Sequence, residues 1–344
     1  MDAQELYRTS TARSAQPLKV VAIGGGTGLG TVLKGLKAYV RTPEHPTLPA
    51  GGFEVGELTA VVTVTDDGGS SGRLRREFNM LPPGDIRNCM VALSEDEALL
   101  ARLFQYRFPA GTGLEGHSFG NLFLTALANV TGDFAEAVKL STAILASRGH
   151  IVPSTTSNVQ LDAFMDNGSR VRGETSITAS PHRILELRLV PANARPLPQT
   201  LRAIEEADVI TVGPGSLFTS LIPNLLVRGI PEAIVASPAL KVFICNLMTQ
   251  AGETRGFTAS RHARTLAEAA GEGLLDTVLV NSRIPPESLV EKYRLEGAEV
   301  VRFDPDGFEG MGVTIVRADL MSATSLVRHD PASLAREILS LARE

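Results

Sequence analysis

The sequence predicts an α/β fold, a Rossmann-like and mostly parallel sheet with helices on both faces and a small antiparallel β insertion. Short β-branched runs alternate with helical stretches along most of the chain, and this alternation is typical of parallel βαβ units. Glycine-rich segments follow several predicted strands, as in nucleotide-binding folds of this class. The dipeptide Asn167-Gly168 lies between two strand-like segments, which favours a tight hairpin and hence the antiparallel insertion.

The N-terminal half begins with strands at 19–23 (KVVAI) and 58–65 (LTAVVTVT), which are continuously apolar as buried parallel strands are. Glycine-rich residues 24–30 precede a predicted helix at 31–40, and Pro and Gly predict a long loop at 41–57. Four more helices are expected, at 85–93, 95–104, 121–130 and 134–145. Asp133 is positioned to cap the last of these.

The remaining chain divides into the insertion and a second series of alternating elements. The insertion has strand-like segments at 159–165, 169–175 and 184–190. The later strands are predicted at 208–212, 242–245, 276–280, 300–303 and 312–316. The later helices are predicted at 201–207, 218–227, 261–270, 286–296 and 331–343. We therefore expect one domain at 18–344, with a β-rich subdomain inserted at about 151–190, after a flexible N-terminal tail at 1–17.

The composition and charge of the chain limit the functional classes to which it can belong. Hydrophobic residues make up 43% and charged residues 21% of the chain, a balance typical of globular proteins. A net charge of −5, few aromatic residues and no Trp disfavour nucleic-acid binding. The two cysteines, Cys89 and Cys245, have no CxxC partner, which fits a reducing cytoplasm. With no signal peptide or membrane-spanning run in the sequence, we expect a cytoplasmic homo-oligomer without membrane insertion or a nucleic-acid partner.

The segment GGGTGLG at 24–30 is the first candidate phosphate site. Backbone N–H groups of successive glycines and the start of the following helix can bind an anion together. The contacts are predicted for Gly25, Gly26, Thr27 and Gly28. The segment lacks the Lys of a Walker A loop, and Leu29 occupies the third glycine position of GxGxxG. Alternatively, the segment is only a tight turn from strand to helix and binds no phosphate.

The segment TVTDDGGSSGR at 63–73 is the second candidate. Paired carboxylates at a strand end, here Asp66 and Asp67, can hold Mg²⁺ or bind ribose hydroxyls. Phosphate contacts are predicted for Ser70, Ser71, Gly72 and Arg73. The alternatives are an Asp-Gly turn followed by solvated arginines, and a GxSxG nucleophile elbow at 68–72. Residues 66–69 separate the predicted strand from Ser70, which argues against the elbow.

Two further polar segments, PPGDIRN and HSFGN, each precede a predicted helix. They add the candidate nucleotide contacts Asp85, Arg87, Asn88, His117, Ser118 and Asn121. Asp85 and Ser118 could equally be helix N-caps. His117 could be a general base, a ribose contact or a satisfied polar residue.

Loops after two later strands complete the candidates. Gly213-Pro214-Gly215-Ser216 repeats the strand–glycine–helix pattern and could hold a second phosphate or the base, while 246–254 is long and polar for a simple connection. The candidate nucleotide contacts here are Gly213, Gly215, Ser216, Leu217, Asn246, Met248, Thr249 and Glu253. The sequence contains no zinc-site spacing of His and Cys.

Six segments together resemble one known family. They are GGGTGLG, TVTDDGGSSGRLR, PPGDIRN, HSFGNLFL, GPGSLFTSLIPNLL and CNLMTQAGETRGF. On these motifs the sequence is identified as a member of the bacterial gluconeogenesis-factor (cell-morphogenesis) family, which is related to 2-phospho-L-lactate transferase. The resemblance covers residues 19–316, and six segments in the family's order are more specific than any one of them.

The resemblance implies a Rossmann-like fold with an inserted subdomain and a nucleotide-diphosphate site. For the gluconeogenesis factors it implies binding of a uridine-diphosphate (UDP) sugar and a role in cell shape and wall synthesis during gluconeogenic growth, with cell-wall synthesis proteins as partners. For the transferase it implies guanosine diphosphate, a flavin-like acceptor and Mg²⁺ at Asp67. TDDGGSSGRLR, HSFGN and NLMTQAGET resemble the gluconeogenesis factors, and no segment resembles the acceptor-binding segments of the transferase.

Three functions are compatible with these patterns. The leading hypothesis is a regulatory protein that binds a UDP sugar, and the second is a Mg²⁺-dependent transferase. The third is a nicotinamide-dependent oxidoreductase with Asp66 on the ribose. Two observations argue against an oxidoreductase. The GxGxxG pattern is not matched, and roughly forty residues separate the glycine loop from Asp66, where about twenty are expected in dinucleotide-binding folds. The nucleotide site requires the loops at 24–31 and 213–218 to converge on one anion.

Overall fold

The computed structural model describes residues 16–43, 45–95, 99–111, 113–271, 273–322, 324 and 326–343. Residues 1–15 of the predicted tail and part of the predicted helix at 95–104 lie outside the described residues. The α/β fold predicted from the sequence is confirmed, with a parallel sheet, covering helices and a small antiparallel sheet. Within the described residues, no helix combines the length and the apolar character that a membrane span requires.

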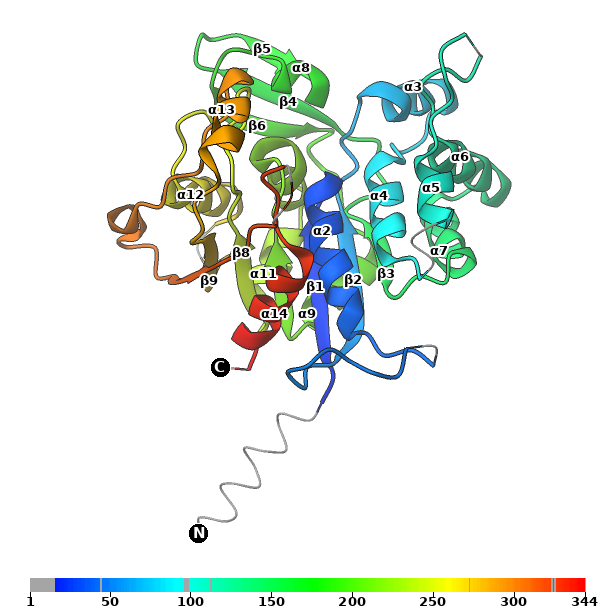
Figure 1. Cartoon of the computed structure of the whole chain (residues 1–344). Coiled ribbons are helices and arrows are strands. Elements are labelled where there is room, and N and C mark those ends of the chain that lie inside the picture. Colours follow the sequence, from blue (N-terminus) through cyan, green and yellow to red (C-terminus); the bar gives the residue numbers. More distant parts are fainter. Residues whose placement is uncertain are drawn as a thin grey trace.

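A seven-stranded parallel sheet forms the centre of the molecule (Figure 1), in the order β3-β2-β1-β7-β8-β9-β10. Its strands are β1 (Leu18–Gly24), β2 (Val55–Val62), β3 (His150–Pro153), β7 (Val209–Val212), β8 (Leu240–Ile244), β9 (Thr277–Asn281) and β10 (Thr314–Ala318). The central strands are buried on both faces: all four residues of β7, VITV, are buried. This burial explains why they read as continuous apolar runs.

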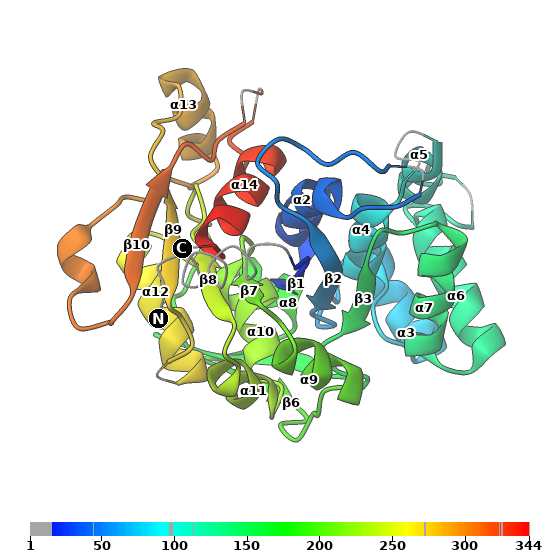
Figure 2. The same cartoon turned by 90° about the horizontal axis from the view of Figure 1, so that it is seen from below.

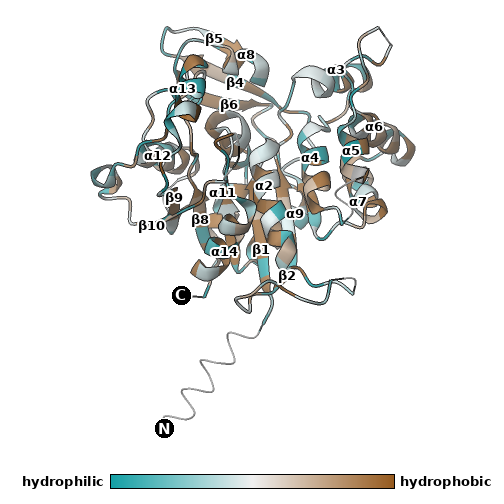
Figure 3. Cartoon of the chain, viewed as in Figure 1, coloured by the Kyte–Doolittle hydropathy of each residue, from teal (hydrophilic) through white to brown (hydrophobic). Residues whose placement is uncertain are grey.

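Helices cover both faces of the sheet (Figures 1 and 2). One face packs against α2 (Gly26–Leu36), α4 (Gly84–Leu93) and α14 (Pro331–Leu341). The other packs against α9 (Pro198–Glu205), α10 (Ile222–Leu225), α11 (Ile230–Ala236) and α12 (Ala259–Ala270). Successive strand residues therefore enter two different cores, as Ala22 and Ile23 do. Figure 3 shows hydrophobic residues concentrated in the central strands.

The remaining helical elements lie between and beyond these layers. They are η1 (Lys37–Tyr39), α3 (Gly69–Phe78), α5 (Leu99–Gln105), α6 (Phe119–Thr131), α7 (Phe134–Ile144), α8 (Glu174–Thr178), the π-helix η2 (Leu217–Leu221), α13 (Glu287–Leu295) and η3 (Pro305–Phe308). Asp133 caps α7 as predicted, because its side chain accepts a hydrogen bond from the Glu136 N–H.

The order of the strands reverses between β1 and β7. After β1 the chain forms β2 and β3 on one side, and it later forms β7 to β10 on the other. β1 and β7 are direct neighbours, with Val20 opposite Val209 and Ile23 opposite Val212. Ligands of open α/β sheets bind beyond the carboxyl ends of the strands at such a reversal. The loops after β1 and β7 therefore occupy the position where a ligand site is expected.

The predicted boundaries around the first two glycine-rich segments were wrong. The first helix begins at Gly26 rather than at residue 31, so the glycine segment is its first turn. Glycine is a poor helix former, but Leu29, Val32 and Leu33 are fully buried on this helix and outweigh that preference. Residues 69–73, expected as part of the loop at 63–73, belong to α3 (Gly69–Phe78), which buries Leu74 against the core.

Three other element predictions also need correction. Residues 300–303 form only isolated bridges to Met248 and Thr258, not a strand. The segment 169–175 gives the short strand β5 (Arg170–Arg172) and then α8, because Gly173 turns the chain at φ +91°. The predicted helix at 218–227 is divided between η2 and α10. Residues 150–153 form β3, which pairs with β2 in the main sheet.

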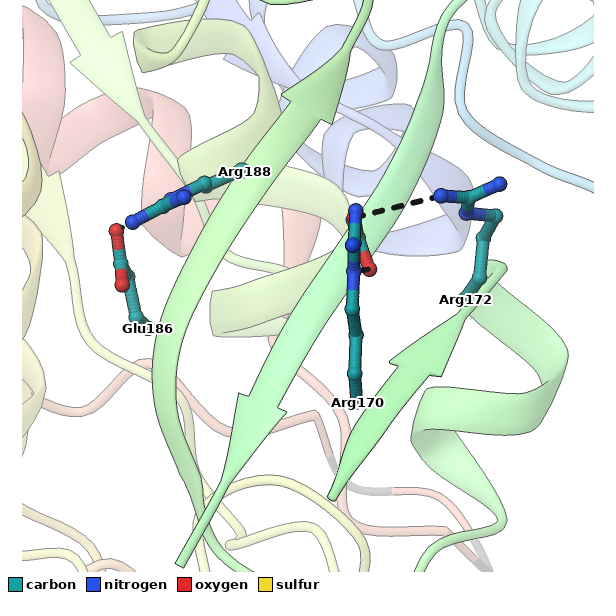
Figure 4. Close-up of polar contacts among 5 residues, drawn as sticks. Arg170, Arg172, Glu186 and Arg188 are labelled. Carbon is teal, nitrogen blue, oxygen red and sulfur yellow. Dashed lines mark hydrogen bonds and ion pairs between the residues drawn. The ribbon is translucent and has the colours of Figure 1, made fainter. Parts of the chain in front are cut away.

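The insertion forms a three-stranded antiparallel sheet, β5-β4-β6, from β4 (Gln160–Met165), β5 and β6 (Ile184–Val190). Asp162 of β4 lies directly opposite Arg172 and Arg188. Its carboxylate is only 1% exposed, accepts hydrogen bonds from Arg170 Nε, and lies 3.7 Å from the Arg172 guanidinium. Figure 4 shows these arginines around β4, with Glu186 beside Arg188. The hydrogen bond from Arg170 holds the pKa of Asp162 below its usual range.

Replacing Asp162 by Asn should lower the free energy of unfolding by about 1–3 kcal/mol, because arginines on the small sheet lose their buried counter-charge. Since the folded-state pKa of Asp162 is depressed, this contribution is present above the ordinary Asp pKa of about 4 and is lost as the pH falls through the folded value. Urea denaturation at neutral and acidic pH measures both effects. As a control, Glu186→Gln removes the half-exposed partner of Arg188 and should cost less than about 1 kcal/mol; equal losses would contradict the assignment.

Candidate functional site

The loops after β1 and β7 are in direct backbone contact. Gly28, in the first turn of α2, packs so closely that an added Cβ would lie 2.1 Å from the Pro214 carbonyl oxygen. Asn246, just after β8, fixes the same loop. Its Oδ1 accepts a hydrogen bond from Gly215 N (3.1 Å) and its Nδ2 donates to Gly215 O (2.8 Å). Three neighbouring strands, β1, β7 and β8, thus end in one connected backbone surface.

The amino end of α2 makes this surface suitable for an anion. Gly25 is the N-cap and supplies no side-chain hydrogen bond, and the first N–H groups of a helix have no intrahelical acceptor. The Gly26 N–H donates to the Asp85 carboxylate, while Thr27 and Gly28 line the neighbouring cleft. The helix dipole and these N–H groups together favour a phosphate at this position.

A cleft of about 840 Å³ runs along α2, within the roughly 300–1,000 Å³ of small-molecule sites. Its lining includes the predicted contacts Thr27, Gly28, Asn88, Gly215, Ser216, Asn246, Met248 and Thr249. Gln250 also lines it and donates a hydrogen bond from Nε2 to Ser216 Oγ at 2.7 Å. The cleft therefore brings together candidates from the loops after β1, β7 and β8 and from α4.

Several residues of the cleft belong to no motif recognised in the sequence. They are Lys34, Tyr293, Glu296, Arg328 and His329. Lys34 follows Thr27 by seven residues on α2, a spacing that puts both on one face of the helix and could have identified it. Arg328 and His329 precede α14 and reach the cleft only through the tertiary fold. Burial lowers the pKa of His329 to about 4, so its ring is neutral.

Four carboxylates gather on the other side of the amino end of α2. Asp66 and Asp67 follow β2, Asp85 lies in the first turn of α4, and Glu174 begins α8. Burial and the charge of Asp66 raise the pKa of Asp85 to about 7. Burial, followed by the charges of Asp66 and Asp85, raises the pKa of Glu174 to about 9. A Cβ on Gly84 would lie 2.8 Å from Asp66 Oδ2, so the positive amino end of α4 adjoins these carboxylates.

The carboxylates provide the oxygen ligands that Mg²⁺ prefers. No set of three or more His, Cys, Asp or Glu side chains in the described part of the chain is arranged to hold a metal ion. Mg²⁺ often binds through one or two carboxylates together with substrate phosphates. Asp66 and Asp67 thus fit an ion shared with a bound diphosphate better than a site made by protein alone.

Ser70, His117 and Asn121 form a separate buried network. Ser70 Oγ lies 3.0 Å from His117 Nδ1 and accepts a hydrogen bond from Asn121 Nδ2, also at 3.0 Å. Arg87 NH1 donates to Ser118 Oγ (2.7 Å) and to Asn121 Oδ1 (3.2 Å). These residues are not part of the cleft lining. Residues 63–69 separate the end of β2 from Ser70, so the strand-to-helix elbow of a serine hydrolase is not formed.

Two acidic candidates connect the insertion to the main sheet. Asp67 Oδ1 accepts hydrogen bonds from the N–H (2.9 Å) and hydroxyl (2.7 Å) of Thr175 in α8. The buried Glu253 carboxylate accepts from Phe218 N (3.1 Å), Thr219 Oγ1 (2.9 Å) and Thr178 Oγ1 (3.3 Å). Burial raises the pKa of Glu253. Both side chains therefore fix the small sheet over the carboxyl ends of the parallel strands.

The other predicted contacts lie outside the cleft. Ser71 and Gly72 are buried in α3, where a Cβ on Gly72 would lie 1.8 Å from the Asp67 carbonyl oxygen. Arg73 donates a hydrogen bond to the Glu115 carbonyl oxygen. Leu217 is fully buried in a hydrophobic core. Gly213, at φ +86°, turns the chain out of β7.

Comparisons with known proteins give a consistent result. The family 2-phospho-L-lactate transferase CofD matches residues 20–321. The gluconeogenesis factor of Bacillus subtilis is 44% identical over 330 residues, covering 96% of this chain and 99% of that protein. The gluconeogenesis factor of Halalkalibacterium halodurans is 44% identical, covering 93% and 95%. A crystal structure of a UPF0052 family protein from Bacillus halodurans superposes with a TM-score of 0.87 at 43% identity, covering 94% of this chain and 99% of that one.

Replacing Gly28 by Ala should destabilise the protein by about 1–3 kcal/mol, the usual cost of overpacking. The added Cβ would meet the Pro214 backbone, which cannot rotate away as a side chain can. Chemical denaturation of the variant and the wild type measures the loss. Gly30→Ala is a matched control on the same helix, because its Cβ would have only ordinary contacts at 3.8 Å. A Gly28→Ala protein as stable as Gly30→Ala would show that the two loops are not in close contact.

Proposed function

The chain belongs to the 2-phospho-L-lactate transferase CofD family, as a gluconeogenesis factor, and on this basis we propose that it binds a UDP sugar in the cleft along α2. The observation that carries the proposal is the contact between the loops after β1 and β7. It combines the amino end of α2, where Asp85 accepts the Gly26 N–H and the next residues, Thr27 and Gly28, line the cleft, with a cleft of suitable volume. Diphosphates bind at this combination of features in open α/β sheets.

The diphosphate would lie on the first turn of α2 and on the loop after β7. The N–H groups of Thr27 and Gly28 would bind its oxygens, and Ser216 and Gln250 would add side-chain groups from the same cleft. The nucleoside would extend into the cleft beside Asn88 of α4. The sugar would point towards Asp66 and neighbouring carboxylates, which can accept hydrogen bonds from its hydroxyl groups.

We propose a regulatory role for this binding. The chain would report the supply of a UDP sugar to proteins of cell-wall synthesis and so influence cell shape during gluconeogenic growth. The relatives named gluconeogenesis factors support this assignment, because two of them align over nearly their whole length. The sequence motifs TDDGGSSGRLR, HSFGN and NLMTQAGET point to the same branch of the family.

A Mg²⁺-dependent transferase is the second candidate. The carboxylates beside α2 and the match to 2-phospho-L-lactate transferase CofD favour it. Asp66 and Asp67 would hold the ion against the diphosphate, and bound Mg²⁺ would neutralise charge that develops on the phosphoryl oxygens. The first turn of α2 would orient the phosphorus, so that an acceptor hydroxyl loses its proton to water and forms the new P–O bond as the bond to the leaving phosphate or nucleotide breaks.

Asn246→Ala should weaken the binding of UDP-N-acetylglucosamine about tenfold, equal to about 1.4 kcal/mol. The substitution removes both hydrogen bonds that fix Gly215 without touching α2. Isothermal titration calorimetry measures the affinity directly. Asn129→Ala, on α6, is the control and should leave the affinity unchanged. If the wild type gives no heat with UDP-N-acetylglucosamine and no competition by UDP, the proposed ligand is wrong.

Mg²⁺ should tighten binding of the UDP sugar in the wild type but not in Asp67→Asn, because the variant removes a carboxylate placed to share the ion. Thr175→Val separates this effect from a loosened insertion, since it removes only the hydroxyl that contacts Asp67 and should keep the response to Mg²⁺. Chromatography of the reaction mixture then tests for catalysis. Mg²⁺-dependent turnover that is lost in Asp67→Asn beyond its loss of affinity would favour the transferase, and its absence in the wild type would favour the binding protein.

A further inference from the structure

A second, smaller cavity is lined by residues 181–185, at the start of β6, and by Arg261, Thr265 and Glu268 of α12. Its volume is about 150 Å³, well below the roughly 300–1,000 Å³ of most small-molecule sites. Phe218 and Phe257 form apolar parts of the lining, and charged side chains from the start of β6, from the loop 251–255 and from α12 form the rest. The cavity can therefore hold only a small molecule or a small part of a larger one.

Positive charge predominates around this cavity. Three of its lining residues are arginines, Arg183, Arg255 and Arg261. Arg261 is paired with Glu268 at 3.6 Å. Among the described residues, none forms an ion pair or hydrogen bond with the side chain of Arg183 or Arg255. The lining also includes Glu253 and Glu268, so its arginines exceed its glutamates by one, and the exposed Arg183 and Arg255 are the two arginines without a partner in the described part of the chain.

These features match one class of ligand. Guanidinium groups bind phosphate through paired, charge-assisted hydrogen bonds, and a phosphate monoester carries nearly two negative charges at neutral pH. We propose that the cavity beside α12 is an anion site that binds a small phosphate ester. The phosphate would lie between Arg183 and Arg255, and Phe218 and Phe257 would contact a short carbon chain.

The cavity shares a wall with the nucleotide cleft. Ala251 lines both spaces, Gln250 before it lines only the cleft, and Gly252 after it lines only the cavity. Gln250 donates to Ser216 in the cleft, whereas Glu253 lines the cavity and accepts from Phe218 N at 3.1 Å. Occupancy of the cavity therefore constrains residues 250–253 and, through them, the loop after β7. This coupling rests on the proposed nucleotide function, and the anion site itself does not.

Calorimetric titration of the full chain with glycerol 3-phosphate tests the site. Arg183→Gln/Arg255→Gln should weaken binding at least tenfold relative to the wild type. The matched control is Arg195→Gln/Arg228→Gln, which changes the charge equally at exposed positions outside both cavities and should bind as the wild type does. Equal affinity in the two double variants would overturn the site. Heat with inorganic phosphate but none with glycerol 3-phosphate would overturn the assignment to an ester.

The coupling is tested by titrating UDP with and without saturating glycerol 3-phosphate. Wild type and control should show a UDP affinity that changes about fivefold, within the usual range of coupling between sites, whereas Arg183→Gln/Arg255→Gln should show none. An unchanged UDP affinity in the wild type would overturn the coupling. If UDP itself does not bind, the nucleotide proposal fails, while the glycerol 3-phosphate titration still decides the anion site.

Discussion

The backbone contact between the loops after β1 and β7 is the constraint on which the rest of this molecule depends. Parallel pairing of β1 with β7 brings the two loops to the same edge of the sheet, and the absence of a side chain at Gly28 lets them meet at van der Waals distance. Asn246 then fixes Gly215 from the next strand. Because α2 begins within this contact, the direction of its amino end is set by the sheet. The contact between these two loops also determines the shape of the cleft.

The insertion shares an apolar core with the main sheet, through residues such as Leu161 and Ile177, and two carboxylates add polar connections to it. Asp67 binds the first turn of α8, and Glu253 joins α8 to the amino end of η2. Asp67 and Glu253, which were predicted from the sequence to contact a ligand, therefore also hold the insertion in place. Such carboxylates are well suited to this role, because a helix amino end presents several N–H groups without acceptors. The small sheet is held over the strand ends where a ligand would enter.

Much of the fold could be predicted because its signals are local. Apolar runs such as 19–23 and the Asn167-Gly168 turn reflect burial and turn geometry that the residues themselves dictate. Helix α3 could not be predicted, since its segment GSSGRLRREF is polar and rich in glycine, and only tertiary packing of Leu74 and Ser71 makes it helical. The candidate site likewise contains some residues that local sequence patterns identify and others that only the tertiary fold brings in. The glycine loops and the paired acids could be predicted from local patterns. Arg328 and His329 come from the segment before the last helix, and Glu174 comes from the insertion. No local pattern in the sequence indicates that these three residues lie near the site.

The cleft along α2 and the four carboxylates beside it affect each other through their charges. Asp66, Asp67, Asp85 and Glu174 lie close together beside α2, and burial and neighbouring carboxylates disfavour the charged forms of two of them, raising the pKa of Asp85 to about 7 and that of Glu174 to about 9. A diphosphate bound to the first turn of α2 would add further negative charge within a short distance, where the low local dielectric makes repulsion strong. If the proposed function holds, binding would be accompanied by proton uptake on Asp85, whose pKa lies near 7, or by a cation shared with the phosphates. The cleft would supply the shape of the site, and the charge of Asp85 or the shared cation would determine how tightly it holds an anion.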